Sequence, residues 1–442
     1  MNRFSFAVPE VIPAGFSTWR WALIAAAEAT FDQVFYLNNN DLTYPNDPFP
    51  NRLYAGAKRV VPFTSGNDLQ DLSDFHRQHP CHLVGYIGYD VKNQLEDLQS
   101  RHADQLAFPD SWFIEPTYLI DFEEDTVVVQ THLPDAGPWA RWLTKPGTAC
   151  PAKVGLPASM KMVNVPGRVQ ARVSKADYVD TVARIRALIE AGDVYELNYC
   201  IEFFTDQVRL SPVEAYRALC QRSPMPFSVF MKQGDRYVLG ASPERFLKKM
   251  DIRLVSQPIK GTIRRGQTPE EDEALKNQLR NSEKEQAENL MIVDLVRNDL
   301  ARSAETGTVK VDELFGIYTF RQVHQMISTV SARQRAGISL AEVLGNAFPM
   351  GSMTGAPKIR AMQRIDELEA SRRGVYSGAM GYITPTGDFD FNVVIRSILY
   401  NAAQERASFM VGSAITYDAD PAQEYAECLL KASAMLAVLE GN

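Results

Sequence analysis

The strongest constraint on the fold of this chain is the order of its strand signals, which follow one another with few helices between them. Alternating apolar and polar residues mark strands over 113–133, and further strand-like runs occupy 194–204, 226–233, 237–250 and 252–259. A parallel sheet would need a crossover, usually a helix, after nearly every strand. Strand runs that helices only occasionally interrupt favour an α+β fold with layered antiparallel β-sheets and flanking helices.

Four helices are indicated among and after these strands, one of which follows the glycine-containing turn at 351–358. Ser174, with an acidic residue three positions on, is typical of a helix start, and apolar residues then recur at helical spacing until Gly192. A long helical run is expected over 270–304. A last helix should begin at Pro421, because Asp420 is a good N-cap and proline suits the first helical position.

A segment rich in proline and glycine runs from Pro134 to Gly167, and the strand and helix patterns disappear within it. Frequent proline and glycine residues are typical of a loop between folded units. We therefore expect two domains, one over 1–150 and one over 174–440.

Charge and hydropathy exclude several classes of partner. The 442 residues include 46 Lys plus Arg and 54 Asp plus Glu, a net charge of −8, without a long basic run. This balance argues against nucleic acid or an anionic membrane surface as the main partner. No apolar run approaches the roughly 18 residues of a membrane-spanning helix, and the first residues lack a signal-peptide pattern. The expectation is a cytoplasmic protein.

The cysteines and histidines give a weaker signal. Five cysteines form no CxxC pair and are too scattered for a disulfide framework, so reduced thiols are expected. The stretch HRQHPCH at 76–82 has a spacing that can collect zinc. No second half-site follows it, and a polar loop ahead of a strand explains it equally well, so both interpretations stay open.

Two helical segments each carry glutamates three residues apart, Glu285 with Glu288 and Glu424 with Glu427. At about 100° per residue each pair shares one helix face, and Lys431 shares the face of the second pair. Converging carboxylates suit Mg²⁺, which takes oxygen ligands and keeps water or substrate in its remaining positions. The alternative, two solvated helix faces, is not excluded by spacing alone.

Four further features carry possible chemistry. Lys260 ends an apolar strand before a glycine, where burial would lower its pKa and make the amine nucleophilic; a lysine that reaches out to water is the alternative. Glu244 is a general acid if it is buried, or an ion-pair partner of Arg245. The turn at 351–358 is a candidate anion site at a helix N-terminus, and Arg396 can bind a carboxylate through two parallel hydrogen bonds.

The order and wording of these motifs are much more specific than any one of them. SPERF, PIKGT, AENLMIVDLVRNDLAR, GSMTGAPKIRAMQRIDELE, GYI…VVIRS and DPAQEYAECLLK occur in this order. Together they closely resemble the chorismate-utilising enzymes over 174–440, and LVGYIGYD at 83–90 resembles that family's N-terminal domain. The resemblance implies the fold of anthranilate synthase component I, with an N-terminal domain over 1–150 and a chorismate-binding catalytic domain over 174–440. It also implies chorismate as substrate and Mg²⁺ as cofactor.

The resemblance assigns roles to the acidic residues. It implies that Glu288 and Glu427 are the Mg²⁺ ligands, and that Glu285 and Glu424 are the next candidates for this role. It implies that Glu244 is the general acid that assists loss of the C4 hydroxyl group of chorismate.

The remaining implied site residues bind the substrate. Two side chains are expected to hold a substrate carboxylate, Tyr382 and Arg396. The backbone around Gly412 and the side chain of Lys431 are expected to help them. Two residues should line the pocket, Thr354 and Gly355.

The residue at the position of Lys260 differs between family members with different activities. The corresponding motif of anthranilate synthases looks like PIAGT, whereas members that aminate C4 have PIKGT, as this chain does. Their lysine is thought to attack C2 before ammonia adds at C4, which gives 4-amino-4-deoxychorismate on the route to 4-aminobenzoate and folate. Because no cysteine stands in a Gly-x-Cys-x-Gly motif, ammonia is expected from a separate glutamine amidotransferase subunit.

Alternatives remain at this point, and so do departures from the family pattern. Anthranilate formation is the first alternative; isochorismate or salicylate formation and a non-catalytic chorismate-binding role come after it. Glu196 stands where water-activating isochorismate synthases have lysine, and Gln325 stands where many relatives have histidine. The sequence at 36–53 does not resemble the family's tryptophan-binding motif, so no tryptophan inhibition is expected.

Overall fold

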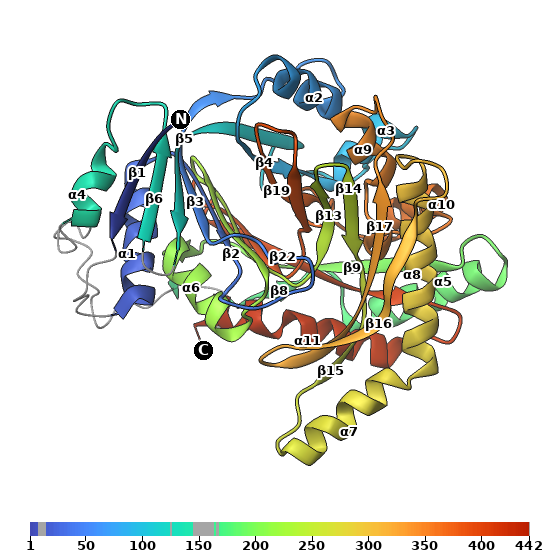
Figure 1. Ribbon diagram of the computed structural model, residues 1–442. Coiled ribbons are helices and arrows are strands. Elements are labelled where there is room, and N and C mark those ends of the chain that lie inside the picture. The colour runs from blue at the N-terminus through green and yellow to red at the C-terminus, as the bar shows by residue number, and fades with distance from the viewer. Residues whose placement is uncertain (8–14, 124–125, 145–162, 165–167, 442) are drawn as a thin grey trace.

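The computed structural model describes residues 1–7, 15–123, 126–144, 163–164 and 168–441 (Figure 1). Its strands are β1 (Asn2–Ala7), β2 (Gln33–Asn38), β3 (Arg52–Val60), β4 (Leu83–Ile87), β5 (Ser111–Phe122), β6 (Thr126–Thr131), β7 (Val163–Asn164), β8 (Gln170–Ala171), β9 (Glu196–Thr205), β10 (Arg209–Leu210), β11 (Phe227–Gln233), β12 (Arg236–Ser242), β13 (Arg245–Met250), β14 (Arg253–Gln257), β15 (Ile259–Arg264), β16 (Lys310–Thr319), β17 (Val323–Arg333), β18 (Gly355–Ala356), β19 (Ala379–Ile383), β20 (Phe389–Val393), β21 (Ser397–Asn401) and β22 (Arg406–Ile415).

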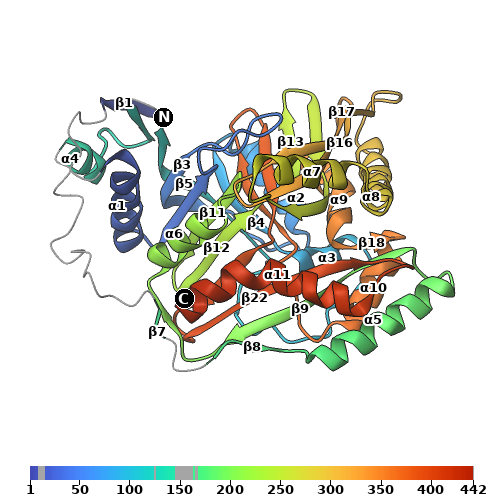
Figure 2. The same ribbon diagram turned by 90° about the horizontal axis from the view of Figure 1, so that it is seen from below.

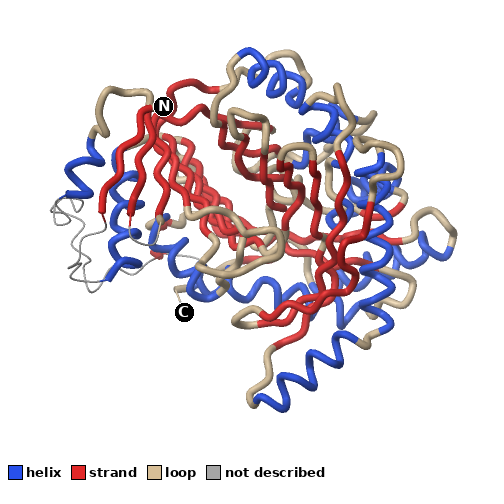
Figure 3. The backbone as a smooth tube through the Cα atoms, in the orientation of Figure 1, coloured by secondary structure: helices blue, strands red, loops and turns tan. Residues whose placement is uncertain are grey.

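The helices lie on the outside of these strands (Figure 3). They are α1 (Gly15–Thr30), α2 (Asp68–Gln78), α3 (Lys92–Leu95), α4 (Pro138–Thr144), α5 (Lys175–Glu190), α6 (Pro212–Arg222), α7 (Pro269–Arg280), α8 (Glu283–Ala301), α9 (Leu340–Ala347), α10 (Lys358–Leu368) and α11 (Pro421–Glu440), with short 3₁₀ turns η1 (Tyr89–Val91) and η3 (Gly351–Met353). No helix in the described ranges is long and apolar enough to cross a membrane.

Twenty strands form one sheet, and its ladders are antiparallel. Hydrogen bonds run from β9 through β22, β21, β12, β11, β2, β3 and β5 to β4, then through β19, β20, β13 and β14 to β17. The predicted α+β class with a large antiparallel sheet and flanking helices is therefore confirmed. Strands from both predicted domains contribute to this sheet; the domain boundaries stay a prediction, and 145–162 of the linker, with Cys150, lie outside the described residues.

The sheet is curved. One of its apolar faces lines the inner side of the curve, and the other face is covered by helices. On β2, Phe35 and Leu37 belong to the inner core, whereas Val34 and Tyr36 pack into the core beneath the helices. This division follows from the two-residue period of a strand. Helix α11 packs on β22 and crosses it diagonally, as Figure 2 shows.

Several predicted boundaries need correction. The run 270–304 is two helices, because Ser282 caps the start of α8 by accepting a hydrogen bond from the backbone of Glu285. The run 237–250 is divided at Pro243 into β12 and β13. Lys260 does not end a strand, since β14 stops at Gln257 and Lys260 lies within β15. Helix α11 starts where the sequence indicated, with Asp420 as its N-cap.

Candidate active site

A cavity of about 390 Å³ opens between the β15 and β17 strands, the end of β22, and helices α8 and α11. All but three of the predicted site residues line it: Glu244, Lys260, Glu285, Glu288, Arg396, Gly412, Glu424, Glu427 and Lys431. These residues come from positions far apart in the sequence. The sheet and two helices bring them to one place.

Lys260 points into this cavity beside a carboxylate that the sequence did not assign. Its ammonium nitrogen lies 2.7 Å from Oε1 of Glu196, on the first residue of β9. Burial lowers the pKa of Lys260, but the charges of Glu196 and Glu288 outweigh burial and hold the pKa above its ordinary value. The predicted lowering of this pKa is therefore wrong. Lys260 rests in the structure as an ammonium ion.

Glu244 lies in the break between β12 and β13 and is only 5% exposed. The hydroxyl of Ser352 donates a hydrogen bond to its Oε1 at 2.7 Å. Burial raises the pKa of Glu244 to about 7, so its protonated form is well populated near neutral pH. Arg245 pairs instead with Asp390 at 2.9 Å, which removes the alternative of a Glu244–Arg245 ion pair.

Arg396 is the cation of the cavity that lacks a carboxylate partner. In the described part of the chain no carboxylate lies within ion-pair distance of it, and its Nη1 contacts Sδ of Met225 at 3.9 Å. Burial lowers the pKa of Arg396 to about 10, although the charge of Glu244 opposes this. A partly buried guanidinium without a counter-ion is unfavourable in the free protein and suits an anionic ligand.

The four predicted metal-binding glutamates face one another from α8 and α11. The ammonium group of Lys284 lies between the helices, 3.8 Å from Glu288 and 3.6 Å from Glu424. Burial raises the pKa of Glu288 to about 7, and burial together with the charge of Glu427 raises the pKa values of Glu285 and Glu424. Carboxylates crowded in this way bind a cation favourably.

The donor atoms of these glutamates suit Mg²⁺, but the four side chains do not lie close enough together to form a complete metal site. No three His, Cys, Asp or Glu side chains of the described residues stand close enough to hold a metal ion. The donor set consists of carboxylate oxygens alone, as a hard divalent cation requires, and a lysine ammonium already lies between two of them.

Lys431 and Gly412 contact each other directly. The ammonium group of Lys431 donates to the Gly412 carbonyl at 2.9 Å and pairs with Glu427 at 2.7 Å. The charge and hydrogen bond of Lys431 outweigh burial and hold the pKa of Glu427 below its ordinary value. A Cβ at Gly412 would lie 2.4 Å from Sγ of Cys200, so only glycine fits here.

Three predicted residues do not line the cavity. Tyr382 points toward Arg52, whose guanidinium lies 5.8 Å from the centre of the ring. Thr354 donates its hydroxyl proton to the Met350 carbonyl at 3.2 Å. Gly355 pairs with β9, where a Cβ would lie 2.1 Å from the carbonyl oxygen of Glu196. Thr354 and Gly355 thus support the strand that carries Glu196.

Tyr376 and Gln325 are among the lining residues that were not assigned a role from the sequence. Tyr376 is buried in the cavity wall, and its hydroxyl lies 3.6 Å from Sγ of Cys200. No periodic pattern marks this tyrosine, because it lies in a turn before β19. Gln325 stood out as a departure from the family pattern, and its buried Oε1 has no hydrogen-bond partner among the described residues.

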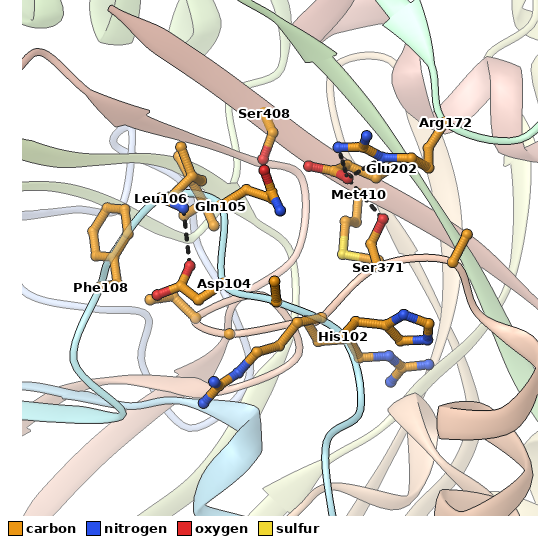
Figure 4. A pocket seen from close by; sticks show the side chains of 17 residues that line it. His102, Asp104, Gln105, Leu106, Phe108, Arg172, Glu202, Ser371, Ser408 and Met410 are labelled. Carbon is orange, nitrogen blue, oxygen red and sulfur yellow. Dashed lines mark hydrogen bonds and ion pairs between the residues drawn. The ribbon is translucent and has the colours of Figure 1, made fainter. Parts of the chain in front are cut away.

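A second cavity of about 130 Å³ is lined by residues that include His102, Arg172 and Glu202 (Figure 4). Two of its charged residues pair with each other: Arg172 donates to Glu202 at 3.0 Å, and the hydroxyl of Ser371 donates to the same carboxylate at 2.7 Å. Met410 lines both cavities and lies between them. We assign no ligand to this second cavity.

His76, in the stretch with possible zinc spacing, binds the Thr384 carbonyl at 2.9 Å.

Comparisons with known proteins identify the family to which the chain is similar. A family model described as chorismate binding enzyme matches residues 43–437. The aminodeoxychorismate synthase of Streptomyces griseus is 42% identical over 373 residues, which cover 81% of this chain and 50% of that protein. Aminodeoxychorismate synthase component 1 of Klebsiella aerogenes is 36% identical over 361 residues, which cover 81% of this chain and 77% of that protein.

A solved structure supports the fold over nearly the whole chain. Anthranilate synthase component I from Streptococcus pneumoniae superposes with a TM-score of 0.74 at 26% identity, covering 90% of this chain and 95% of that one. This chain spans about half the length of the Streptomyces griseus relative.

Proposed function

The chain belongs to the chorismate-binding enzyme family, and we propose that it is the component of an aminodeoxychorismate synthase that aminates chorismate at C4. The product would be 4-amino-4-deoxychorismate, for 4-aminobenzoate and folate synthesis. The observation that carries the proposal is the placement of the Lys260 amine inside the cavity that Glu244 and Arg396 also line. The two relatives reported above carry the name of this activity.

The residues of the cavity support a two-step displacement. The Lys260 nitrogen forms a bond to C2 of chorismate, the ring double bonds shift, and the C4–oxygen bond breaks. Glu244, protonated near neutral pH because burial raises its pKa to about 7, gives its proton to the departing hydroxyl, which leaves as water. Ammonia then bonds to C4 and the bond between C2 and Lys260 breaks. The enolpyruvyl group is retained throughout.

Arg396 and the glutamates would hold the two carboxylates of the substrate. Arg396, a partly buried cation without a protein counter-ion, would bind one of them. Glu288 and Glu427 would hold Mg²⁺, with Glu285 and Glu424 beside them, and the metal supplies a positive charge that binds the other. Lys431 would keep Glu427 ionised.

Magnesium affinity should depend on pH because burial raises the pKa of Glu288 to about 7. Below that pH a proton occupies the carboxylate and competes with the metal, so we expect the Kd for Mg²⁺ to rise about tenfold per pH unit from about pH 7 downward. Isothermal titration of Mg²⁺ into the protein with chorismate, repeated at several pH values, measures this Kd. Glu288→Gln is the control and should bind Mg²⁺ weakly at every pH. An affinity that stays constant between about pH 6 and 8 would contradict the assignment.

Ammonia would come from a glutamine amidotransferase subunit. The Klebsiella aerogenes relative is named as component 1, which implies a second component in that enzyme. For this chain the partner is part of the proposal, and free ammonium can replace it in an assay.

Product identity tests the proposed function. Incubation with chorismate, Mg²⁺ and ammonium, followed by mass spectrometry, should give 4-amino-4-deoxychorismate and no anthranilate fluorescence. The second candidate is anthranilate synthase component I, favoured by the structural similarity to the Streptococcus pneumoniae enzyme. A strong anthranilate signal would replace the first candidate with the second, and the absence of any turnover would favour a non-catalytic chorismate-binding subunit.

A further inference from the structure

Lys260 must lose a proton before it can attack chorismate, and the structure places one carboxylate in contact with it. We propose that Glu196 is the base that accepts this proton and so converts the Lys260 ammonium into the amine nucleophile. The inference rests on the proposed function, because it concerns how the covalent step of that function begins.

The contact is direct and buried. Oε1 of Glu196 lies 2.7 Å from Nζ of Lys260, and Glu196 is 1% exposed. Oε2 of the same carboxylate is buried and has no hydrogen-bond partner among the described residues. A buried acceptor without a partner is unfavourable, and this oxygen remains available to bind a proton.

The backbone holds Glu196 at this position. Residues 355–356 of β18 pair with β9, and Ala356 lies opposite Glu196. The amide of Tyr195 donates to the Ala356 carbonyl at 2.6 Å. The close approach that Gly355 permits therefore fixes the strand end from which the carboxylate reaches Lys260.

The carboxylates that line the cavity are not placed for this role. Among the described residues, Lys260 forms its ion pair with Glu196. Glu244 accepts a hydrogen bond from Ser352 and must be protonated to act as the acid. Glu288 and Glu427 are the proposed metal ligands. Glu196 is the carboxylate that touches the nucleophile.

The proton balance of the step is complete. One proton moves from Nζ of Lys260 to the carboxylate of Glu196, and the freed electron pair forms the bond to C2. The C4 oxygen takes the proton of Glu244 and leaves as water. When ammonia bonds to C4, Lys260 departs as a neutral amine and recovers its proton from Glu196. Glu244 regains a proton from solvent.

The test follows formation of the covalent adduct without ammonia. Protein, chorismate and Mg²⁺ are mixed, quenched at intervals and measured by intact-protein mass spectrometry. The mass of the adduct equals the mass of the protein plus that of chorismate, minus that of one water molecule. Glu196→Gln keeps the shape and a hydrogen-bond acceptor but cannot accept the proton, so the adduct should form about 10²- to 10⁴-fold more slowly. Glu202→Gln changes a buried glutamate of the same strand outside the cavity and should keep the wild-type rate.

A second variant separates a base from a merely structural residue. In Glu196→Ala, added formate or acetate should accelerate adduct formation, acetate more than formate because it is the stronger base. A Glu196→Gln variant that forms the adduct at the wild-type rate, or an alanine variant that carboxylates do not accelerate, would overturn the inference alone. A wild-type protein that forms no adduct would overturn the proposed function and this inference with it.

Discussion

Replacing Lys260 by alanine should reduce amination at C4 by at least about 10³-fold, because the variant has no nucleophile to form the covalent intermediate. The other lysines that line the cavity cannot replace it. Lys284 lies between Glu288 and Glu424, and Lys431 is bound to Glu427. Initial rates with chorismate, Mg²⁺ and ammonium measure the effect, and product identity is checked by mass spectrometry.

A matched control keeps this result specific. Lys249 is also a strand lysine paired with a carboxylate, Asp388, at 3.3 Å, but it does not line the cavity. Lys249→Ala should therefore keep nearly full activity. Chorismate binding in Lys260→Ala should persist, since Arg396 and the glutamates remain. Unchanged C4 amination in Lys260→Ala would exclude the covalent step.

Replacing Arg396 by methionine should weaken chorismate binding and stabilise the free protein at the same time. Losing one member of a desolvated charge pair costs about 2–5 kcal/mol of binding, so the Kd for chorismate should rise about 30-fold or more. Without chorismate the guanidinium is a partly buried charge lacking a carboxylate partner, and its removal should raise the free energy of unfolding by about 1 kcal/mol, the low end of the range for a buried charge. Calorimetric titration measures the first effect and denaturant unfolding the second.

Arg245→Met is the control variant, and it should lower the free energy of unfolding rather than raise it. Arg245 is fully buried and paired with Asp390 at 2.9 Å, so methionine would leave that carboxylate buried without its partner. The free energy of unfolding should fall by about 3–5 kcal/mol. An Arg396→Met variant that is destabilised in the same way and binds chorismate normally would show that Arg396 is structural.

The sequence predicted those parts of the site that depend on local geometry. Asp420 and Pro421 fix the start of α11, and the helical repeat then places Glu424, Glu427 and Lys431 toward the cavity. Their placement needs no knowledge of the rest of the chain, because 3.6 residues per turn determine it.

The pairing of Lys260 with Glu196 could not be predicted in this way. The two residues are 64 positions apart and meet only because β15 and the start of β9 reach the same cavity. The same contact explains why the predicted direction of the Lys260 pKa was wrong. Burial was anticipated from the apolar neighbours, but the carboxylates that outweigh burial lie on β9 and α8.

Strand register explains the difference between the two tyrosines. Tyr382 lies on β19 opposite Asp390 and Val84, and this register points its side chain toward Arg52. Tyr376 precedes the strand and lies in the cavity wall. The sequence shows both tyrosines near one hairpin, but it does not show that the strand begins only at Ala379, which leaves Tyr376 in the preceding turn and outside the alternation that orients Tyr382.

The sheet that joins distant strands also affects how the protein is made. β4 pairs with β5 on one side and with β19 on the other, and β2 pairs with β3 and β11. During translation β4 therefore leaves the ribosome long before 379–383 are synthesised. Until then one edge of β4 has no partner and its apolar residues lack their final cover. Sheets with such long-range pairing fold slowly, and the nascent chain meets the conditions in which chaperones limit aggregation.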